Sequence, residues 1–536
     1  MSRLFFPNRF CAKFSQFAAY DPPWFALRLR QHQINKQRVI LQQQRPYIRS
    51  WSAASSKYKT KSRIWAYGVG VGVALAVGLK YYEDTVKSSC DVSVKSAHTG
   101  RYRAAIEVSR DLLERIKVGT EDEVGAPGMV VGVSVDGQQV WCEGTGYADL
   151  ENRVPCSPQT IMRIASISKP LTTAAAARLC EEGKLDLDVP VQKYVPKFPQ
   201  KQIEGQDVII TPRMIMSHVS GIRHYEKNAK KLADDREKVK PIKEKENEKT
   251  SENKDKSTAE QNNKSKEATQ VQRKTDVEQD EFYLNQKFEN VSQGVDLFKD
   301  DPLVFKPGTG FLYSTHAYTL LSACMEQVAG QRFLDYMMGM FRELGMLNTV
   351  ADENEPIIYH RARFYHIKWG RIVNSPYVDN SYKWAGGGFL STAGDLLLFG
   401  DALLYSYQLA HLKDTEGLLP GFLKPQSVLD LWAPVDKTEA TWDKDGRYAQ
   451  GWLVVEKLQK YGHCRKRRHY VSHTGGAVGA SSVLLVLPAE DIEKGQGKNR
   501  HPPQGVVVTI MTNMQAVGLN TTALKIAHEF DKARSL

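Results

Sequence analysis

The stretch 164–170 reads Ile-Ala-Ser-Ile-Ser-Lys-Pro and contains the motif Ser166-x-x-Lys169. An alanine-rich run from 171 to 179 follows and stops before Gly183, which predicts a helix that begins near the motif. Residues three apart lie on one face of a helix, so the Lys169 amine can reach the Ser166 hydroxyl. A serine becomes a good nucleophile when a neighbouring base takes its proton. A lysine can be that base if burial near a positive helix N-terminus favours its neutral form.

Ser-x-x-Lys alone is a weak signal, because both residue types are common in proteins. The alternative interpretation is an ordinary helix start with a solvated lysine. Two further motifs follow in order along the chain, Tyr313-Ser314-Thr315 and His473-Thr474-Gly475. Each carries side chains suited to proton transfer or substrate binding, and the three motifs together favour a catalytic interpretation.

The net charge of +12 comes from the N-terminal leader. Of the 73 basic and 61 acidic residues, 13 basic residues and one acidic residue lie in 1–63, so the rest of the chain is balanced. This distribution argues against a nucleic-acid partner. A leader rich in Arg, Gln and Ser and nearly free of acids predicts a mitochondrial transit peptide at 1–63. A disordered basic tail is the alternative.

An apolar segment follows the leader at 64–79. Its 16 uncharged residues would span only about 24 Å as a helix, less than the ~30 Å hydrocarbon core of a bilayer. It is interpreted as a marginal membrane segment or an inner-membrane sorting signal, with a shallow anchor as the alternative. Residues 80–97 are expected to be a linker. A transit peptide followed by an apolar stop indicates the mitochondrial intermembrane space.

Residues 98–536 are predicted to form one domain that a charged insertion at 226–281 interrupts. The insertion has 15 basic and 15 acidic residues and no aromatic residue, which predicts disorder, with a single solvated helix as the alternative. Strands are expected at 129–135 and 138–144 around the Asp136-Gly137 turn, and again at 469–474, 481–487 and 506–511. Seven scattered cysteines without zinc spacing predict no metal, no cofactor and no disulfide framework.

The three ordered motifs resemble those of the serine β-lactamase and penicillin-binding-protein superfamily, in its class C and D-alanyl-D-alanine carboxypeptidase branch. Segments 217–221, 305–314 and 384–395 also resemble that branch, and the leader and insertion point to its mitochondrial members. The resemblance implies a mixed α/β (α+β) fold. Its antiparallel sheet would be built from N- and C-terminal strands, flanked by helices, with a mostly helical subdomain inserted between them. The site would lie in the cleft.

The same resemblance implies the roles of the site residues. Ser166 is the nucleophile, Lys169 its base, and Tyr313 a proton relay whose pKa a cationic neighbour lowers. His473, Thr474 and Gly475 replace the usual Lys-Thr-Gly on the strand that lines the cleft. Backbone N–H groups of Ser166 and Gly476 form the oxyanion hole. Thr315 stands where most relatives have Asn, and its hydroxyl cannot hold a substrate amide as Asn does.

Some of these residues have a plainer interpretation. Tyr313 could be a core tyrosine and His473 an ordinary strand residue. Four other histidines are expected to be structural: His218, His224, His316 and His360.

The expected function is that of a serine hydrolase that acts through an acyl-enzyme on peptide or protein substrates. The resemblance to mitochondrial members further implies a protease with a role in mitochondrial lipid metabolism and self-association into filaments. Two alternatives stay open. One is a filament-forming scaffold with vestigial catalysis, and the other is an esterase or amidase for small metabolites.

Overall fold

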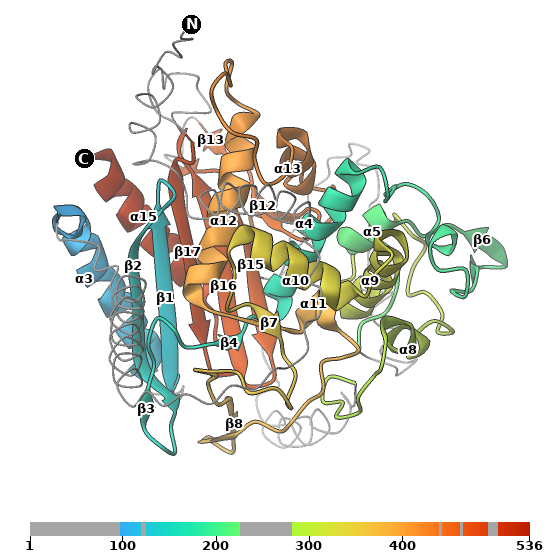
Figure 1. Cartoon of the computed structure of the whole chain (residues 1–536), viewed down its shortest axis with the longest axis horizontal. Coiled ribbons are helices and arrows are strands. Elements are labelled where there is room, and N and C mark those ends of the chain that lie inside the picture. The colour runs from blue at the N-terminus through green and yellow to red at the C-terminus, as the bar shows by residue number, and fades with distance from the viewer. Residues whose placement is uncertain (1–96, 119–124, 226–280, 439–441, 461–464, 491–501) are drawn as a thin grey trace, which may run out of the picture. The chain divides into compact units, whose positions relative to one another are not determined.

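The computed structural model is organised around an eight-stranded antiparallel sheet in the order β11-β12-β15-β16-β17-β1-β2-β3 (Figure 1). β1 (Gly128–Val135) and β2 (Gln138–Asp149) form a hairpin. Its Asp136-Gly137 turn has φ values of 50° and 77°, as a two-residue turn of this type requires. β1 also pairs with β17 (Gly505–Thr512) over seven residue pairs, so the two ends of the fold meet in one sheet. This confirms the predicted sheet and its composition.

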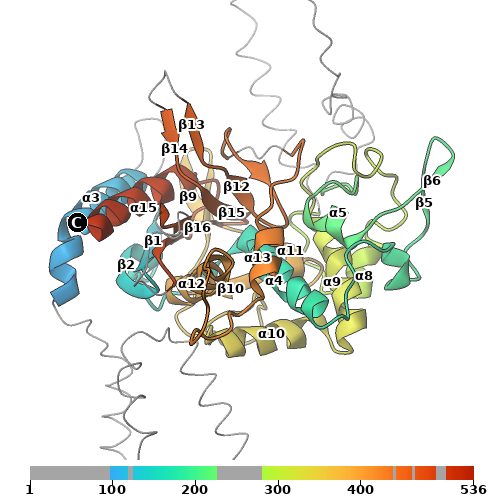
Figure 2. The same ribbon diagram turned by 90° about the horizontal axis from the view of Figure 1, so that it is seen from above.

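The C-terminal half of the sheet completes the layer. It consists of β15 (Tyr470–Ala477), β16 (Ala480–Pro488), β12 (Leu453–Val455) and β11 (Arg447–Tyr448), with β3 (Val154–Pro155) at the opposite edge. All residues of β1, β16 and β17 are buried. Strands that are apolar on both faces need cover on both faces. α12 (Ala393–Leu409) and α15 (Asn520–Ser535) supply it from opposite sides (Figure 2). α3 (Ala97–Val118) reaches β2 through the Arg110–Glu143 ion pair.

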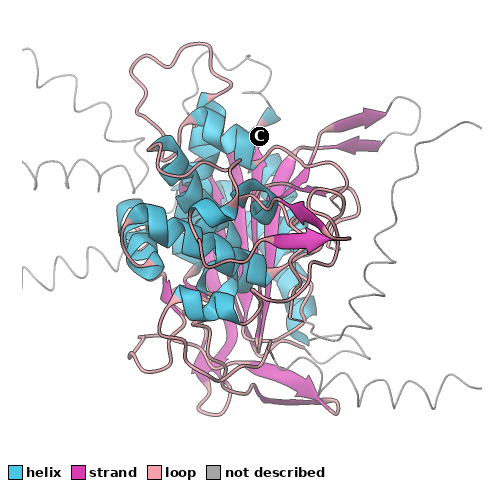
Figure 3. Ribbon diagram, turned by 90° about the vertical axis from the view of Figure 1, so that its right-hand side faces the viewer, coloured by secondary structure: helices cyan, strands magenta, loops and turns pink. Residues whose placement is uncertain are grey.

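A mostly helical subdomain is inserted between the N- and C-terminal strands, as predicted, and lies in front of the sheet in Figure 3. Its helices are α4 (Ser168–Glu181), α5 (Pro212–Met216), α8 (Val291–Asp296), α9 (Thr315–Ala329), α10 (Phe333–Leu344), α11 (Trp384–Gly387) and α13 (Pro425–Leu431). Short helices η1 (Ala165–Ile167) and η2 (Val191–Lys193) precede and follow α4.

Four small sheets complete the described fold. They are β4 (Met162–Arg163) with β10 (Phe389–Ser391) and β7 (Val350–Ala351); β5 (Lys201–Ile203) with β6 (Gln206–Val208); β8 (Tyr365–Lys368) with β9 (Arg371–Asn374); and β13 (Leu458–Lys460) with β14 (Arg465–Arg467).

The structure describes residues 97–118, 125–225, 281–438, 442–460, 465–490 and 502–536. Those from Ala105 onward belong to one compact unit. The predicted transit peptide, apolar segment and linker up to residue 96, and the insertion from 226 to 280, lie outside the described residues. In the part that is described, no helix is both long enough and apolar enough to cross a bilayer.

Helix caps fix the segments that reach the site. Thr211 caps α5 and Thr392 caps α12, each accepting a hydrogen bond from a backbone N–H three residues on, as the sequence predicted. Ser314 caps α9 in the same way. The cap on α9 places Tyr313 directly before the capping residue and Thr315 at the first position of the helix.

One predicted boundary is wrong. Glu281, assigned to the end of the disordered insertion, is buried, and its carboxylate pairs with Arg223 at 2.7 Å and with His316 at 2.7 Å. Charge composition alone cannot separate a solvated glutamate from one that is paired with a buried cation. Glu281 therefore ties the end of the insertion to the core.

Glu281→Gln is expected to lower the free energy of unfolding by about 3 kcal/mol, because it removes one of the two carboxylates that pair with the buried Arg223 guanidinium. Urea denaturation followed by circular dichroism measures the change. Glu289→Ala, at an exposed position eight residues on, is the matched control and should change stability little. Equal stability of both variants would contradict the assignment of Glu281 to the core.

Candidate active site

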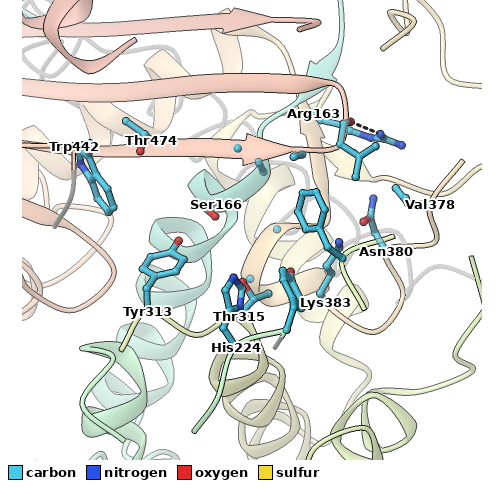
Figure 4. Close-up of a pocket in the computed structure, with 18 residues that line it drawn as sticks. Arg163, Ser166, His224, Tyr313, Thr315, Val378, Asn380, Lys383, Trp442 and Thr474 are labelled. Carbon is cyan, nitrogen blue, oxygen red and sulfur yellow. Dashed lines mark hydrogen bonds between the residues drawn. The ribbon is translucent and has the colours of Figure 1, made fainter. Parts of the chain in front are cut away.

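Ser166 lies on the short helix η1, between β4 and the start of α4, and lines a cavity of about 220 Å³. The residue before it, Ala165, has φ +49°, a left-handed conformation that residues with a side chain rarely adopt. Such strain persists only where the surrounding structure imposes it, and it occurs often at active sites. Here it turns the Ser166 side chain into the cavity (Figure 4).

Strand β15 imposes this conformation by packing very close to η1. A Cβ at Gly475 would lie 2.3 Å from the Ile164 carbonyl oxygen and 2.2 Å from Ser482 Oγ, so only glycine fits. Ser482 Oγ donates to the same Ile164 oxygen at 2.8 Å. Gly475 does not line the cavity, which corrects its predicted substrate-binding role. The glycine at this position permits the close approach of β15 to the turn that carries Ser166.

Lys169 is fully buried, and its Nζ has three polar neighbours. They are Ser166 Oγ at 3.1 Å, the Gly386 carbonyl oxygen at 2.7 Å and Thr315 Oγ1 at 3.4 Å. Burial, and next the positive charge of Lys383, hold the Lys169 pKa well below its ordinary value. A neutral amine has two N–H donors and one lone pair. Gly386 and Thr315 can take both donors, which leaves the lone pair for the Ser166 hydroxyl.

Tyr313 also reaches Ser166, and its hydroxyl shares a hydrogen bond with the serine. Its pKa is raised above the ordinary value because the ring is buried, which corrects the expectation of a lowered pKa. The expected shift needed a cationic Lys169, but burial lowers the Lys169 pKa and favours the neutral amine. Tyr313 therefore retains its proton and is a hydrogen-bond donor at the site rather than a phenolate.

The side chains of His473 and Thr474, which are consecutive in β15, point to opposite sides of the strand. Thr474 and Gly476 line the cavity, whereas the His473 side chain is buried behind them, which corrects its predicted place in the cleft wall. His473 Nε2 shares a hydrogen bond with the Tyr448 hydroxyl at 2.9 Å. Burial lowers the His473 pKa to about 3. This neutral, buried imidazole packs near Tyr313, which lines the cavity, and it supplies no positive charge to a substrate.

Two histidines that were predicted to be structural hold the Tyr313 segment in place. The backbone N–H of Ser314 donates to His218 Nδ1 at 3.1 Å, and that of Thr315 donates to His224 Nδ1 at 3.2 Å. Burial lowers both histidine pKa values well below the ordinary range, so each ring is neutral and can accept. His224 also lines the cavity. The sequence offered no signal for these contacts, because each spans more than 90 positions.

The far wall of the cavity contains residues that the sequence did not single out. Figure 4 shows Tyr313, Thr474 and Trp442 on one side of Ser166, and Lys383, Asn380 and Val378 on the other. Lys383 immediately precedes the glycine-rich turn of α11, which was predicted to lie beside the site. That turn supplies the Gly386 carbonyl that binds Lys169.

Within the described ranges, no group of three His, Cys, Asp or Glu side chains is arranged to hold a metal ion. The site contains a serine, an amine whose neutral form burial favours, a phenol whose pKa burial raises, and open space at Gly476, where an added Cβ would meet no atom within 4 Å.

The sheet, the inserted helices and the Ser166 cavity define the class of β-lactamase and penicillin-binding-protein folds. Two solved structures share this fold, each with 19% identity and each matched over 81% of this chain. They are the octameric penicillin-binding protein homologue from Pyrococcus abyssi, with a TM-score of 0.52 over 76% of that chain, and EstCE1, a hydrolase with promiscuous acyltransferase activity, with a TM-score of 0.54 over 99% of that chain.

The chain belongs to the Beta-lactamase family, which its sequence matches over residues 113–527. A relative from Homo sapiens, "Serine beta-lactamase-like protein LACTB, mitochondrial", is 58% identical over 448 residues, which is 81% of each chain. This agrees with the resemblance that the three motifs indicated.

The rate of Ser166 acylation should rise with pH as Lys169 loses its proton, with a midpoint well below the 10.5 of free lysine. Lys383→Met removes a nearby positive charge, so the Lys169 pKa rises and the midpoint should move to higher pH. Rates of labelling by a neutral fluorophosphonate at several pH values measure this. Lys306→Met, at an exposed lysine, is the control. A shift to lower pH in Lys383→Met would contradict the electrostatic assignment.

Proposed function

We propose that this protein is a serine hydrolase that acts through an acyl-enzyme on Ser166, with Lys169 as its general base. The observation that carries the proposal is the contact between the Lys169 amine and Ser166 Oγ at 3.1 Å, in a buried site where no carboxylate pairs with the lysine among the described residues. A buried lysine without a counter-ion favours its neutral form. A neutral amine beside a serine hydroxyl is an activated nucleophile.

The reaction follows from the positions of the groups. Lys169 takes the Ser166 proton while Oγ bonds to the substrate carbonyl carbon, and the carbonyl electron pair moves onto its oxygen. Backbone N–H groups of Ser166 and Gly476 stabilise that oxyanion, and each such donor contributes about 3–4 kcal/mol in well-studied hydrolases. The carbonyl then re-forms as the bond to the leaving group breaks, and Tyr313 donates its proton to that group and regains one from the Lys169 ammonium. Water then releases the acyl group by the reverse route.

The proposed substrates are peptides or proteins. Mitochondria are the proposed location, supported by the acid-poor leader and by the word mitochondrial in the name of the human relative. The intermembrane space, inner-membrane association, a role in lipid metabolism and self-association into filaments are proposed on the resemblance to mitochondrial family members and on the apolar segment 64–79.

Ester hydrolysis is the second candidate, because one observation favours it. Thr315 stands at the place of the family's Asn, and its hydroxyl lies 3.4 Å from Lys169 Nζ. The Thr315 side chain, at the place where relatives hold a substrate amide, therefore faces Lys169. A site that lacks this contact with a substrate amide favours amide substrates less, whereas its action on esters is not affected.

The proposal is tested by exposing the full-length protein to a fluorophosphonate and measuring its intact mass. We expect one adduct on wild type, none on Ser166→Ala, and a rate lower by about 10²–10⁴-fold in Lys169→Met, which is the usual contribution of a general base. Ser292→Ala, at an exposed serine on α8, should label like wild type.

Two results would overturn the proposal. One is an adduct that persists on Ser166→Ala, and the other is a well-folded wild type that forms no adduct. The second result would favour the scaffold interpretation, in which the fold is kept without the chemistry.

A further inference from the structure

His218 combines two unfavourable features at one position. Its backbone has φ +59°, in the left-handed region that residues with a side chain rarely adopt. Its imidazole is completely buried, and Nε2 has no hydrogen-bond partner among the described residues. Each feature costs stability. Strain of this kind persists only where the surrounding structure imposes it, and it is frequent at active sites. The contacts of His218 therefore show which part of the molecule depends on it.

His218 holds the chain on both sides of Tyr313. The backbone N–H of Leu312 donates to the His218 carbonyl oxygen at 3.0 Å, and that of Ser314 donates to His218 Nδ1 at 3.1 Å. The His218 and Tyr313 rings also pack together, with their centroids 4.3 Å apart. A single residue thus contacts three consecutive residues, and the middle one is Tyr313.

The unpaired Nε2 follows from the bond to Ser314. Burial holds the His218 pKa well below its ordinary value, so the imidazole is neutral and carries one N–H. Because Nδ1 accepts the Ser314 N–H, the ring hydrogen lies on Nε2. The ring is enclosed by aromatic side chains, whose centroids lie 4.3–6.0 Å away in Tyr313, Tyr448, Tyr318 and Phe311. The fold thus accepts an unsatisfied donor in order to place an acceptor beside Tyr313.

Tyr313 needs such support because it lies outside α9. Ser314 caps that helix, and Tyr313 precedes the cap. The Tyr313 hydroxyl shares a hydrogen bond with Ser166, and Figure 4 shows the two side chains directed toward each other. A general acid must lie within hydrogen-bond reach of the atom that it protonates. A displacement of about 1 Å can lower a rate by about 100-fold.

We propose that His218 is a positioning residue that holds the Tyr313 hydroxyl at the leaving group of the substrate. The inference rests on the proposed acyl-enzyme function and deepens it. In the step concerned, the bond between the carbonyl carbon and the leaving atom breaks, its electron pair goes to the leaving atom, and Tyr313 supplies the proton. His218 does not line the cavity, so it acts through Tyr313 and not on the substrate.

This role predicts that His218 matters only when the leaving group needs a proton. p-Nitrophenolate departs as a stable anion, whereas ethoxide must be protonated as it leaves. Loss of the support for Tyr313 should therefore slow an ethyl ester far more than a p-nitrophenyl ester of the same acid. A general loss of structure would slow both esters alike.

The test compares kcat/KM of the full-length protein for ethyl hexanoate and p-nitrophenyl hexanoate, with the rate of Ser166→Ala subtracted. His218→Leu offers no acceptor to the Ser314 N–H, and it should lower the ratio of ethyl to p-nitrophenyl ester by about 10- to 100-fold. His218→Asn should keep the ratio close to that of wild type. Its Oδ1 can replace Nδ1 as the acceptor, and asparagine tolerates the left-handed backbone.

Two further variants show whether the effect passes through Tyr313. Tyr313→Phe removes the proton donor, so adding His218→Leu to it should not lower the ratio again. His360→Leu is the matched control, because His360 also has a left-handed backbone, with φ +60°, but is exposed. It should keep the wild-type ratio.

Labelling by a neutral fluorophosphonate separates this inference from the proposed function, because fluoride leaves without a proton from Tyr313. His218→Leu should label Ser166 at nearly the wild-type rate. If His218→Leu does not fold, His218→Gly replaces it, since glycine adopts the left-handed conformation without strain.

Four results would overturn the positioning role. They are an unchanged ester ratio in a folded His218→Leu or His218→Gly, an equal loss on both esters and on labelling, a further fall of the ratio in the double variant, and a wild type that hydrolyses only the p-nitrophenyl ester. Failure of wild-type Ser166 to label at all would overturn the hydrolase proposal instead.

Discussion

The chemistry of this site depends on the burial of Lys169 without a carboxylate partner. A lysine in water is protonated at neutral pH and cannot take a proton from a serine. Complete burial removes the hydration that stabilises the ammonium form, and a second buried lysine, Lys383, opposes that charge further. A single glutamate or aspartate against Lys169 would reverse the effect. The nearby buried carboxylates are instead held by arginines: Glu281 by Arg223, and Asp352 by Arg163.

The fold supplies the groups around that amine from distant parts of the chain. Ser166 and Lys169 come from one turn, Thr315 begins α9, and the Gly386 carbonyl belongs to α11. β15 closes the site from the sheet, and Gly475 permits its close approach. Because the interior is closely packed, a shift in one of these elements changes the distance to Lys169. The two neutral histidines that bind the Ser314 and Thr315 backbone limit such shifts.

Described residues on both sides of the charged insertion line the Ser166 cavity. His224 and Tyr225 precede the insertion and Phe282 follows it, and all three line the cavity. Arg223 and Glu281, one on each side of the insertion, form a buried ion pair. This ion pair joins the residues before the insertion to those after it. The cavity wall near Lys383 includes residues from both sides of the insertion, Tyr225 and Phe282.

The sequence by itself determined the parts of this protein that depend on local pattern. Ser166 on η1 and Lys169 at the start of α4 lie close because of their spacing, the Asp136-Gly137 turn follows from its residue types, and alternating or apolar runs indicate the strands of the sheet. The order of three short motifs was enough to indicate the family, which the comparisons show. Caps at Thr211 and Thr392 were likewise predictable, because a cap is a contact across three residues.

Only the tertiary structure decided which groups are buried and what each one faces. The direction of the Tyr313 pKa shift, the withdrawal of His473 behind β15, the packing role of Gly475 and the pairing of Glu281 all depend on partners far along the chain. The tertiary structure likewise decided the position of Lys383, because nothing in its neighbouring sequence shows that it borders the Ser166 cavity. Desolvation and charge pairing depend on the atoms that surround a group in space. Those atoms come from distant parts of the chain, so they surround the group only once the chain has folded.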